Sequence, residues 1–200
     1  MSASVITYAG GMVRWEPGTR ERLQAAALDL FATRGFEQTT AAEIAQSVGL
    51  TERTFFRHFP DKREALFHGQ ELFVAAFLTG ARESQAGAPP LEVVRAALAS
   101  AATFFADERR PHSRRRQTVI DANPALQERE RHKMVGLADT LGDLLRDRGV
   151  AEPAATLAAR MGTTVFEVSF AAWIAAGEER SMAEIQSAVF AELVALAHDR

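Results

Sequence analysis

Residues 35–67 read GFEQTTAAEIAQSVGLTERTFFRHFPDKREALF and are the most informative part of the sequence. Thr40 is followed three positions later by Glu43, which is the spacing of a capping box at the start of a helix. Apolar residues then recur at helical spacing until Gly49, a residue type that commonly ends helices. The pattern therefore predicts a short helix between Thr40 and Gly49.

A second short helix is expected directly after the first. Thr51 is its predicted N-cap, the helix runs to about His58, and Pro60 marks its end. Two short helices joined by a glycine-containing turn form a helix-turn-helix, which presents its second helix to the major groove of DNA. The residues spaced to form its small core are Ile44, Val48, Leu50, Phe55 and Phe59. Because a helix of barely two turns is not stable alone, we interpret its role as the presentation of side chains.

The rest of the sequence predicts an all-α fold, because apolar residues recur three and four positions apart from Leu23 onward. The first helix should have Thr19 as its N-cap and end at Gly35, and a long fourth helix should cover residues 61–85. Residues 84–90 contain the clearest linker signal. Further helices are expected at residues 91–108, 112–121, 125–148, 153–176 and 182–198.

Three regions are expected along the chain. Residues 1–18 are interrupted by glycine and proline and predict a mobile tail, in which either Met1 or Met12 is the true start. Residues 19–64 are expected to form the helix-turn-helix domain, and residues 65–200 a second, helical-bundle domain.

Composition excludes several classes of protein. The 200 residues are 47% hydrophobic and 24% charged, which is an ordinary globular composition. The absence of cysteine excludes disulfides, thiolate nucleophiles and cysteine-based zinc sites. The net charge of −3 means that any nucleic-acid binding must depend on a local surface. No signal peptide or membrane-spanning run is recognisable, which predicts a cytoplasmic protein without membrane association.

The helix-turn-helix stretch strongly resembles the TetR family of transcriptional repressors. The resemblance is carried by the run TT-x-x-EIA at residues 39–45, the turn VGL at 48–50, the helix TFFRHF at 54–59 and the pair DK at 61–62. It covers about 45 residues, while the length and helix count of the whole chain also fit the family's nine-helix architecture. It implies a homodimer that binds double-stranded operator DNA and releases it when a small molecule binds the second domain.

The resemblance also implies which residues contact DNA. The expected phosphate contacts are Thr40, Phe56, His58 and Lys62, and the residues expected to face base edges are Glu52, Arg53, Thr54 and Arg57. Thr40 and Thr51 cap helices whose positive N-terminal ends can point at phosphate. Arg53 is the best candidate for a bidentate contact with guanine.

Two departures from the family pattern bear on DNA recognition. Phe56 stands where the family often has tyrosine, so a hydroxyl contact is lost. Ala41 and Ala42 lack the long side chains that some members use to reach bases from the first helix of the motif. Base recognition should therefore depend almost entirely on the second helix of the motif.

The second domain carries bulky apolar side chains whose default role is in the core. The resemblance implies an apolar effector pocket among the helices that carry them. The candidate pocket residues are Phe104, Phe105, Met134, Leu137, Leu141, Phe166, Phe170 and Trp173. The consecutive Arg114, Arg115 and Arg116 form either a solvated basic face or, with Arg116 as the candidate ligand residue, an anion grip for an acyl-CoA-like molecule.

The last helix is apolar on more than one side, so one side can pack inside the subunit while another needs a partner. Both this pattern and the resemblance predict a four-helix dimer interface made from two copies of residues 153–176 and 182–198. The stripe assigned to the interface consists of Met182, Ile185, Val189 and Leu193.

The function predicted from these features is a ligand-responsive repressor without enzymatic activity or cofactor. The five histidines are scattered and form no ligand pair, and there is no phosphate-cradling glycine loop or catalytic triad spacing. The alternatives are a transcriptional activator of the same fold and a helical adaptor that does not bind DNA.

Overall fold

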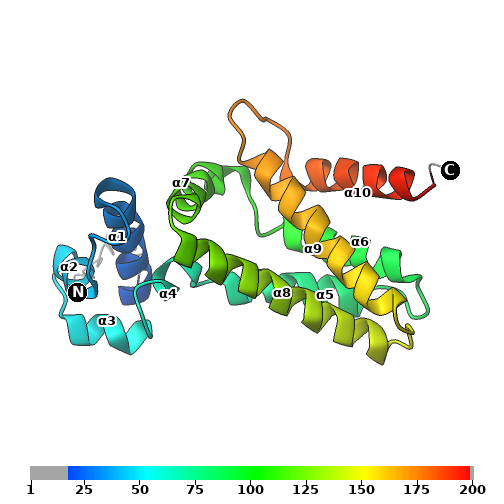
Figure 1. The fold of residues 1–200 in the computed structure, drawn as a ribbon, viewed down its shortest axis with the longest axis horizontal. Coiled ribbons are helices and arrows are strands. Elements are labelled where there is room, and N and C mark those ends of the chain that lie inside the picture. The colour runs from blue at the N-terminus through cyan, green and yellow to red at the C-terminus, as the bar shows by residue number, and fades with distance from the viewer. Residues whose placement is uncertain (1–17, 199–200) are drawn as a thin grey trace, which may run out of the picture.

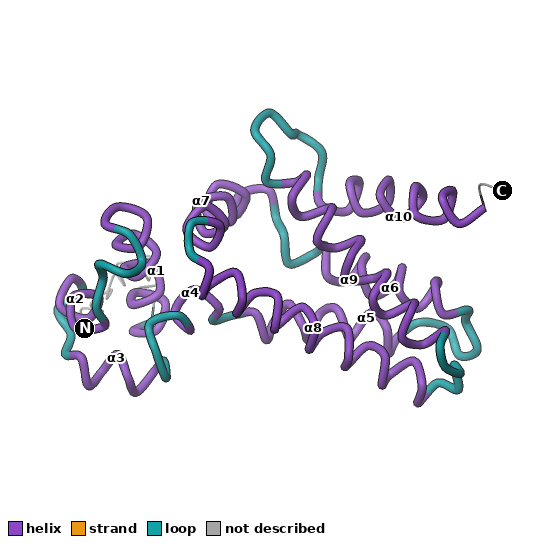
Figure 2. Tube along the Cα trace, viewed as in Figure 1, coloured by secondary structure: helices purple, strands orange, loops and turns teal. Residues whose placement is uncertain are grey.

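The computed structural model describes residues 18–198, and the predicted mobile tail lies almost entirely outside them. The described chain consists of helices and loops without a strand, which confirms the all-α prediction (Figures 1 and 2). The N-terminal elements are α1 (Thr19–Arg34), α2 (Ala41–Ser47), α3 (Glu52–His58) and α4 (Glu64–Phe67). They are followed by α5 (Gln70–Glu83), α6 (Pro90–Ala102), η1 (Asp107–Arg109), α7 (Arg110–Asp121), α8 (Pro124–Asp147), α9 (Ala154–Trp173) and α10 (Met182–His198).

The predicted caps of the two short helices are present. Glu43 N–H donates to the Thr40 hydroxyl at 3.2 Å, and the Glu43 carboxylate accepts the Thr40 N–H at 2.8 Å, which completes the capping box. Thr51 accepts the N–H of Thr54 at 3.3 Å. The prediction that Thr19 is an N-cap is wrong, because α1 already begins at Thr19 and the preceding Gly18 occupies the cap position.

The predicted long fourth helix is broken in two. α4 ends at Phe67, His68 is extended, and Gly69 adopts a left-handed conformation with φ of 86° before α5 begins at Gln70. This conformation is accessible to glycine without a steric penalty, so the chain changes direction between α4 and α5. The prediction of a single helix over residues 61–85 is therefore wrong, because two helices, α4 and α5, lie in this range.

The later helices agree with the predicted ranges to within a few residues, with one larger difference. α6 ends at Ala102 instead of continuing to residue 108. The Thr103 hydroxyl donates to the Ser100 carbonyl at 2.7 Å. The N–H groups of Phe104 and Phe105 donate to the carbonyls three residues before them. These tighter turns, followed by η1, replace the last part of the predicted helix.

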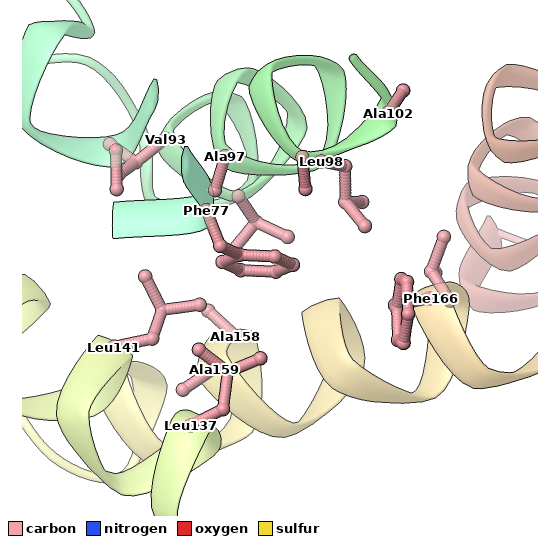
Figure 3. Packing of buried hydrophobic residues seen from close by; sticks show 14 of the residues in the cluster. Phe77, Val93, Ala97, Leu98, Ala102, Leu137, Leu141, Ala158, Ala159 and Phe166 are labelled. Carbon is pink, nitrogen blue, oxygen red and sulfur yellow. The ribbon is translucent and has the colours of Figure 1, made fainter. Parts of the chain in front are cut away.

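The buried apolar side chains of the described residues form two hydrophobic clusters. The larger cluster joins α5, α6, α8, α9 and α10, and Figure 3 shows Phe77 between α6 on one side and Leu137 and Leu141 of α8 on the other. α5 and α6 approach closely because Gly80 has no side chain: a Cβ atom there would lie 2.3 Å from the Ala96 carbonyl oxygen. The larger cluster therefore belongs to the C-terminal helices alone.

The smaller cluster contains the helix-turn-helix core but extends beyond it. It includes all of the buried residues of α1 to α4, and also Val119, Ile120 and Leu126 from α7 and α8. Figure 1 shows α7 and the start of α8 beside the N-terminal helices. The domain boundary between residues 64 and 65 stays a prediction. No helix within residues 18–198 is both long and apolar enough to span a membrane.

Candidate DNA-binding head and effector domain

The outer face of α3 is an exposed and mostly charged surface. Glu52, Arg53 and Arg57 are exposed, and Phe56 retains 49% of its accessible surface. Phe55 and Phe59 face inward and are fully buried, with their ring centroids 5.3 Å apart. The helix thus has Glu52, Arg53, Phe56 and Arg57 outside and Phe55 and Phe59 inside, whereas Thr54 and His58 are half-buried.

The turn of the motif is held by α1. Gly49 has a φ of 74°, and the Leu50 N–H returns to the Ala45 carbonyl at 2.9 Å. Arg22 on α1 donates to the Val48 carbonyl at 2.7 Å. Arg22 therefore fixes the distance between α1 and the turn from which α3 begins.

Two of the predicted phosphate-contacting residues have features that the sequence did not reveal. His58 has its Nε2 atom buried without a hydrogen-bond partner in the described chain. Burial, followed by the nearby charges of Arg57 and Arg20, lowers the pKa of His58, which favours the neutral imidazole at pH 7. The ammonium group of Lys62 is bonded to two backbone carbonyls of the turn before α2. Their roles in DNA contact stay predictions.

In the C-terminal helices, five aromatic side chains surround the ring of Phe105. Phe105 lies at the centre of this group, with ring centroids 5.3 Å from Phe104, 5.5 Å from Phe166 and 5.6 Å from Trp173. Phe73 and Phe170 complete the group, each 5.6 Å from Phe105. Phe73 was not among the predicted pocket residues, because its position on α5 gave no sign that it meets α9.

The predicted pocket set divides into two parts. Its aromatic members belong to the group around Phe105, which we call the aromatic cluster and define as Phe73, Phe104, Phe105, Phe166, Phe170 and Trp173. Met134, Leu137 and Leu141 are buried in the same larger core. Figure 3 places Leu137 and Leu141 near Phe77, with Phe166 well apart from them.

Trp173 connects the aromatic cluster to α7. It is fully buried, and its Nε1–H donates to the Asp107 carboxylate at 3.3 Å. The Arg110 guanidinium lies 5.1 Å from the Trp173 ring centroid and binds the same carboxylate at 2.6 Å. Hydrogen bonds from Arg110 and then Trp173 lower the pKa of Asp107.

Arg110 also ties α7 to the loop between α9 and α10, because it donates to the carbonyls of Glu178 and Arg180. Within that loop, hydrogen bonds from Arg180 lower the pKa of Glu178 to about 2. The loop projects from the end of α9 in Figure 2. Arg110 therefore joins α7, the Trp173 ring at the end of α9 and the loop between α9 and α10.

The three consecutive arginines of α7 each contact a different element. Arg114 donates to the carbonyls of Ile174 and Ala175 at the end of α9, at 2.6 and 2.9 Å. Arg115 pairs with Asp29 on α1. Arg114 and Arg115 are exposed, as in a solvated basic face, although both also bind acceptors of the protein itself; the anion grip stays a prediction.

Arg116 lies against α4 and α8. Its Nε–H donates to the Leu66 carbonyl at 2.8 Å, it pairs with Glu130 at 3.1 Å, and it lies over the Phe67 ring at 5.0 Å. Burial lowers the pKa of Arg116, and Glu130 opposes that effect. We call α1 to α4 the head. The Arg116 guanidinium, which was predicted to hold an anionic ligand group, thus lies at the junction between the head and the C-terminal helices.

The junction has a second ionic group. Glu64 at the start of α4 accepts Arg129 at 2.7 Å and Lys133 at 3.4 Å, both from α8. No local sequence pattern could have revealed these pairs, because the partners lie more than 60 residues apart.

The stripe assigned to the dimer interface packs inside the subunit instead. Met182 and Ile185 are each only 1% exposed, and Val189 and Leu193 are partly buried against the same core. The exposed apolar side chains lie elsewhere, at Leu157 and Val168 of α9 and Leu196 of α10. Met182 and Ile185 are therefore withdrawn from the predicted interface.

The described chain is thus a helix-turn-helix protein with a larger helical domain attached. Residues 23–68 match the family model described as "Bacterial regulatory proteins, tetR family". Residues 23–68 are therefore similar to the DNA-binding domain of TetR family transcriptional regulators.

Two curated relatives match less than half of the chain. The HTH-type transcriptional regulator TcmR of Streptomyces glaucescens is 39% identical over 80 residues, which are 40% of this chain and 35% of that protein. The uncharacterised regulator YerO of Bacillus subtilis is 30% identical over 93 residues, 45% of this chain and 32% of its own. The match thus spans about a third of the length of each relative.

Solved structures match over nearly the whole chain. Thermus thermophilus FadR, described as a TetR family transcriptional repressor in complex with lauroyl-CoA, is 28% identical, with a TM-score of 0.51 over 88% of this chain and 93% of that one. A transcriptional regulator from Rhodococcus sp. Rha1 has a TM-score of 0.55 over 90% and 97%, at 19% identity. The second match shows the fold alone.

Proposed function

We propose that the protein is a ligand-responsive regulator that binds operator DNA as a homodimer and acts as a repressor released by an apolar effector. The observation that carries the proposal is the outer face of α3, on which Arg53 and Arg57 are exposed while Phe55 and Phe59 anchor the helix beneath. Neither guanidinium is bonded within residues 18–198, which leaves both available for base edges or phosphates. An activator of the same fold would use the same face.

Arg53→Ala tests this face. We expect a loss of about 1–3 kcal/mol in binding a duplex that the unmodified protein has selected from a random pool, with relaxed preference at one base position. Arg82→Ala, which removes an exposed arginine from α5, is the control for net charge. Fluorescence anisotropy titrations measure both variants. Equal losses in the two would remove α3 from the proposed interface.

The aromatic cluster supports an apolar effector. Its rings meet in edge-to-face, tilted and stacked pairs and are contributed by α5, α9 and the turn after α6, so a ligand among them would contact three segments at once. A hundredfold loss of operator affinity needs about 2.7 kcal/mol of differential binding, and burial of about 100 Å² of acyl chain supplies that amount. The lauroyl-CoA named for the FadR structure is compatible with this class of ligand.

The contacts of α7 support a route by which such a ligand would affect the head. Arg110 and Arg114 hold the Trp173 ring and the carbonyls that follow it at the end of α9. On the same helix, the adjacent Arg115 and Arg116 hold α1 and α4. A shift of Trp173 would move α7 and therefore α1 and α4, which share a buried cluster with Phe55 of α3. The route passes through α7, because the single long helix expected over residues 61–85 is broken at Gly69.

Dimerisation is proposed through the exposed face of α9 together with α10. Leu157, Thr164, Val168 and Ala171 are exposed and lie at spacings of 7, 4 and 3 residues, which is one face of a helix. Leu196 extends the apolar surface on α10, where it is 65% exposed. A second copy of the chain would cover this surface through an isologous interface.

Val168→Glu tests the interface. A carboxylate placed on this face should raise the dimer dissociation constant at least about tenfold, because it would be desolvated without a partner. Leu72→Glu makes the same kind of change at a side chain of α5 that is 64% exposed and should leave association unchanged. Sedimentation velocity across a concentration series distinguishes the variants. An undisturbed dimer with Val168→Glu would exclude this face.

A further inference from the structure

Lys62 occupies an unusual place for a residue expected to contact DNA phosphate. It follows α3, and its Nζ donates to the Phe36 carbonyl at 2.8 Å and the Thr39 carbonyl at 3.1 Å. The same ammonium lies 4.2 Å from the centroid of the Phe36 ring. Two of its three N–H donors are therefore used inside the protein.

The acceptors of Lys62 belong to a turn that is itself fixed. Thr39 is 1% exposed, and its hydroxyl donates to the Gly35 carbonyl at the end of α1 at 2.9 Å. Phe36 is buried and meets Phe31 of α1 edge to face, with centroids 5.0 Å apart. Lys62 is thus bonded to a turn anchored on α1.

Lys62 is also fixed from its own side. Asp61 accepts the N–H groups of Arg63 and Glu64 at 2.8 and 3.1 Å, which sets the backbone between α3 and α4. Lys62 therefore joins the turn before α2 to the turn after α3. It closes the helix-turn-helix at the two points where the chain enters and leaves it.

We infer that Lys62 is a positioning residue, which sets the orientation of the α2–α3 pair on α1 and does not act chiefly as a charge against phosphate. A seven-residue helix such as α3 cannot hold its own orientation and depends on such contacts. Hydrogen bonds from an ammonium to carbonyls are stronger than those between neutral groups, which suits this role. The inference rests on the proposed DNA-binding function.

Lys62→Met and Arg57→Ala test the inference as a matched pair, because each removes one positive charge from the head. The probes are the duplex selected by the unmodified protein and an unrelated duplex of equal length. Binding is titrated at several salt concentrations and at a temperature where circular dichroism shows both variants folded.

The two variants should behave differently. Lys62→Met should weaken the selected duplex about tenfold and the unrelated duplex less than about twofold, with an unchanged salt slope, because phosphate contacts set that slope. Its melting temperature should fall by about 3 °C, because the tie between the turns is lost. Arg57→Ala should weaken the selected duplex without a change in melting temperature, because this exposed side chain is expected to face base edges and does not hold the fold.

Three results would overturn the inference. If Lys62→Met lowers the salt slope by about one unit and weakens both duplexes alike, its role is a phosphate contact. If it lowers only the melting temperature, the residue is structural without positioning α3, and unchanged values throughout exclude both roles. Should the unmodified protein select no duplex, the proposed function fails, while hydrogen exchange of the Phe36 and Thr39 amides still tests the tie: faster exchange in Lys62→Met supports it and equal exchange refutes it.

Discussion

Trp173→Ala is expected to destabilise the protein by about 3–5 kcal/mol, the range found for the truncation of large buried aromatic residues. The side chain is fully buried, and its removal would leave a cavity beside Phe105 and Phe170. It would also remove the ring beneath Arg110 and one donor to Asp107. Urea unfolding followed by far-ultraviolet circular dichroism measures the loss.

Trp173→Phe is the matched control. It keeps an aromatic ring in the cluster but removes the Nε1–H that donates to Asp107, so the expected loss is about 1–2 kcal/mol. A loss below about 1 kcal/mol for Trp173→Ala would show that the cluster collapses around the gap or is loosely packed. Because of this structural role, the effect of Trp173 on an effector response has to be measured on variants that remain fully folded.

Arg116→Met is expected to destabilise the protein by about 3 kcal/mol, because it breaks a partly buried ion pair and leaves Glu130 without its cation. The Leu66 carbonyl would lose its donor in the same variant. Arg115→Met removes the neighbouring arginine, whose pair with Asp29 is exposed on both sides, and should cost less than about 1 kcal/mol.

The difference between the two arginine variants is the decisive quantity. Free energies of unfolding from urea titrations give it directly, and a double variant that adds Glu130→Gln to Arg116→Met isolates the contribution of the pair. Equal small losses of unfolding free energy for Arg115→Met and Arg116→Met would mean that the Arg116 guanidinium does not hold α4 on α7. The route from the aromatic cluster to the head would then need another explanation.

The head could be predicted closely because its determinants are local. The capping box of Thr40 and Glu43, the cap at Thr51 and the end of α1 at Gly35 each depend on residues a few positions apart, and the structure contains all three. The break at Gly69 was missed because a single glycine in an otherwise helical pattern is often tolerated, and the apolar spacing continues on both sides of it.

The remaining errors concern contacts between distant residues. Arg114 and Arg116 find their acceptors 50 to 61 positions away, so no spacing along the sequence could reveal that they are occupied. In α10, apolar residues lie on several sides of the helix. Without the position of α9, the sequence could not show that Met182 and Ile185 lie on the buried side. Local patterns fixed which helices form, whereas packing decided which faces they bury.

The sharing of one hydrophobic cluster by α1 to α4 with α7 and α8 has a consequence for protein engineering. A sensor with a new DNA specificity is usually made by exchanging the head between relatives. Here an exchange at residue 64 would separate Glu64 from its two cationic partners on α8, and the buried residues of α1 to α3 from Val119 and Ile120. A functional chimera should therefore take the complementary faces of α7 and the first turns of α8 from the same parent as the head.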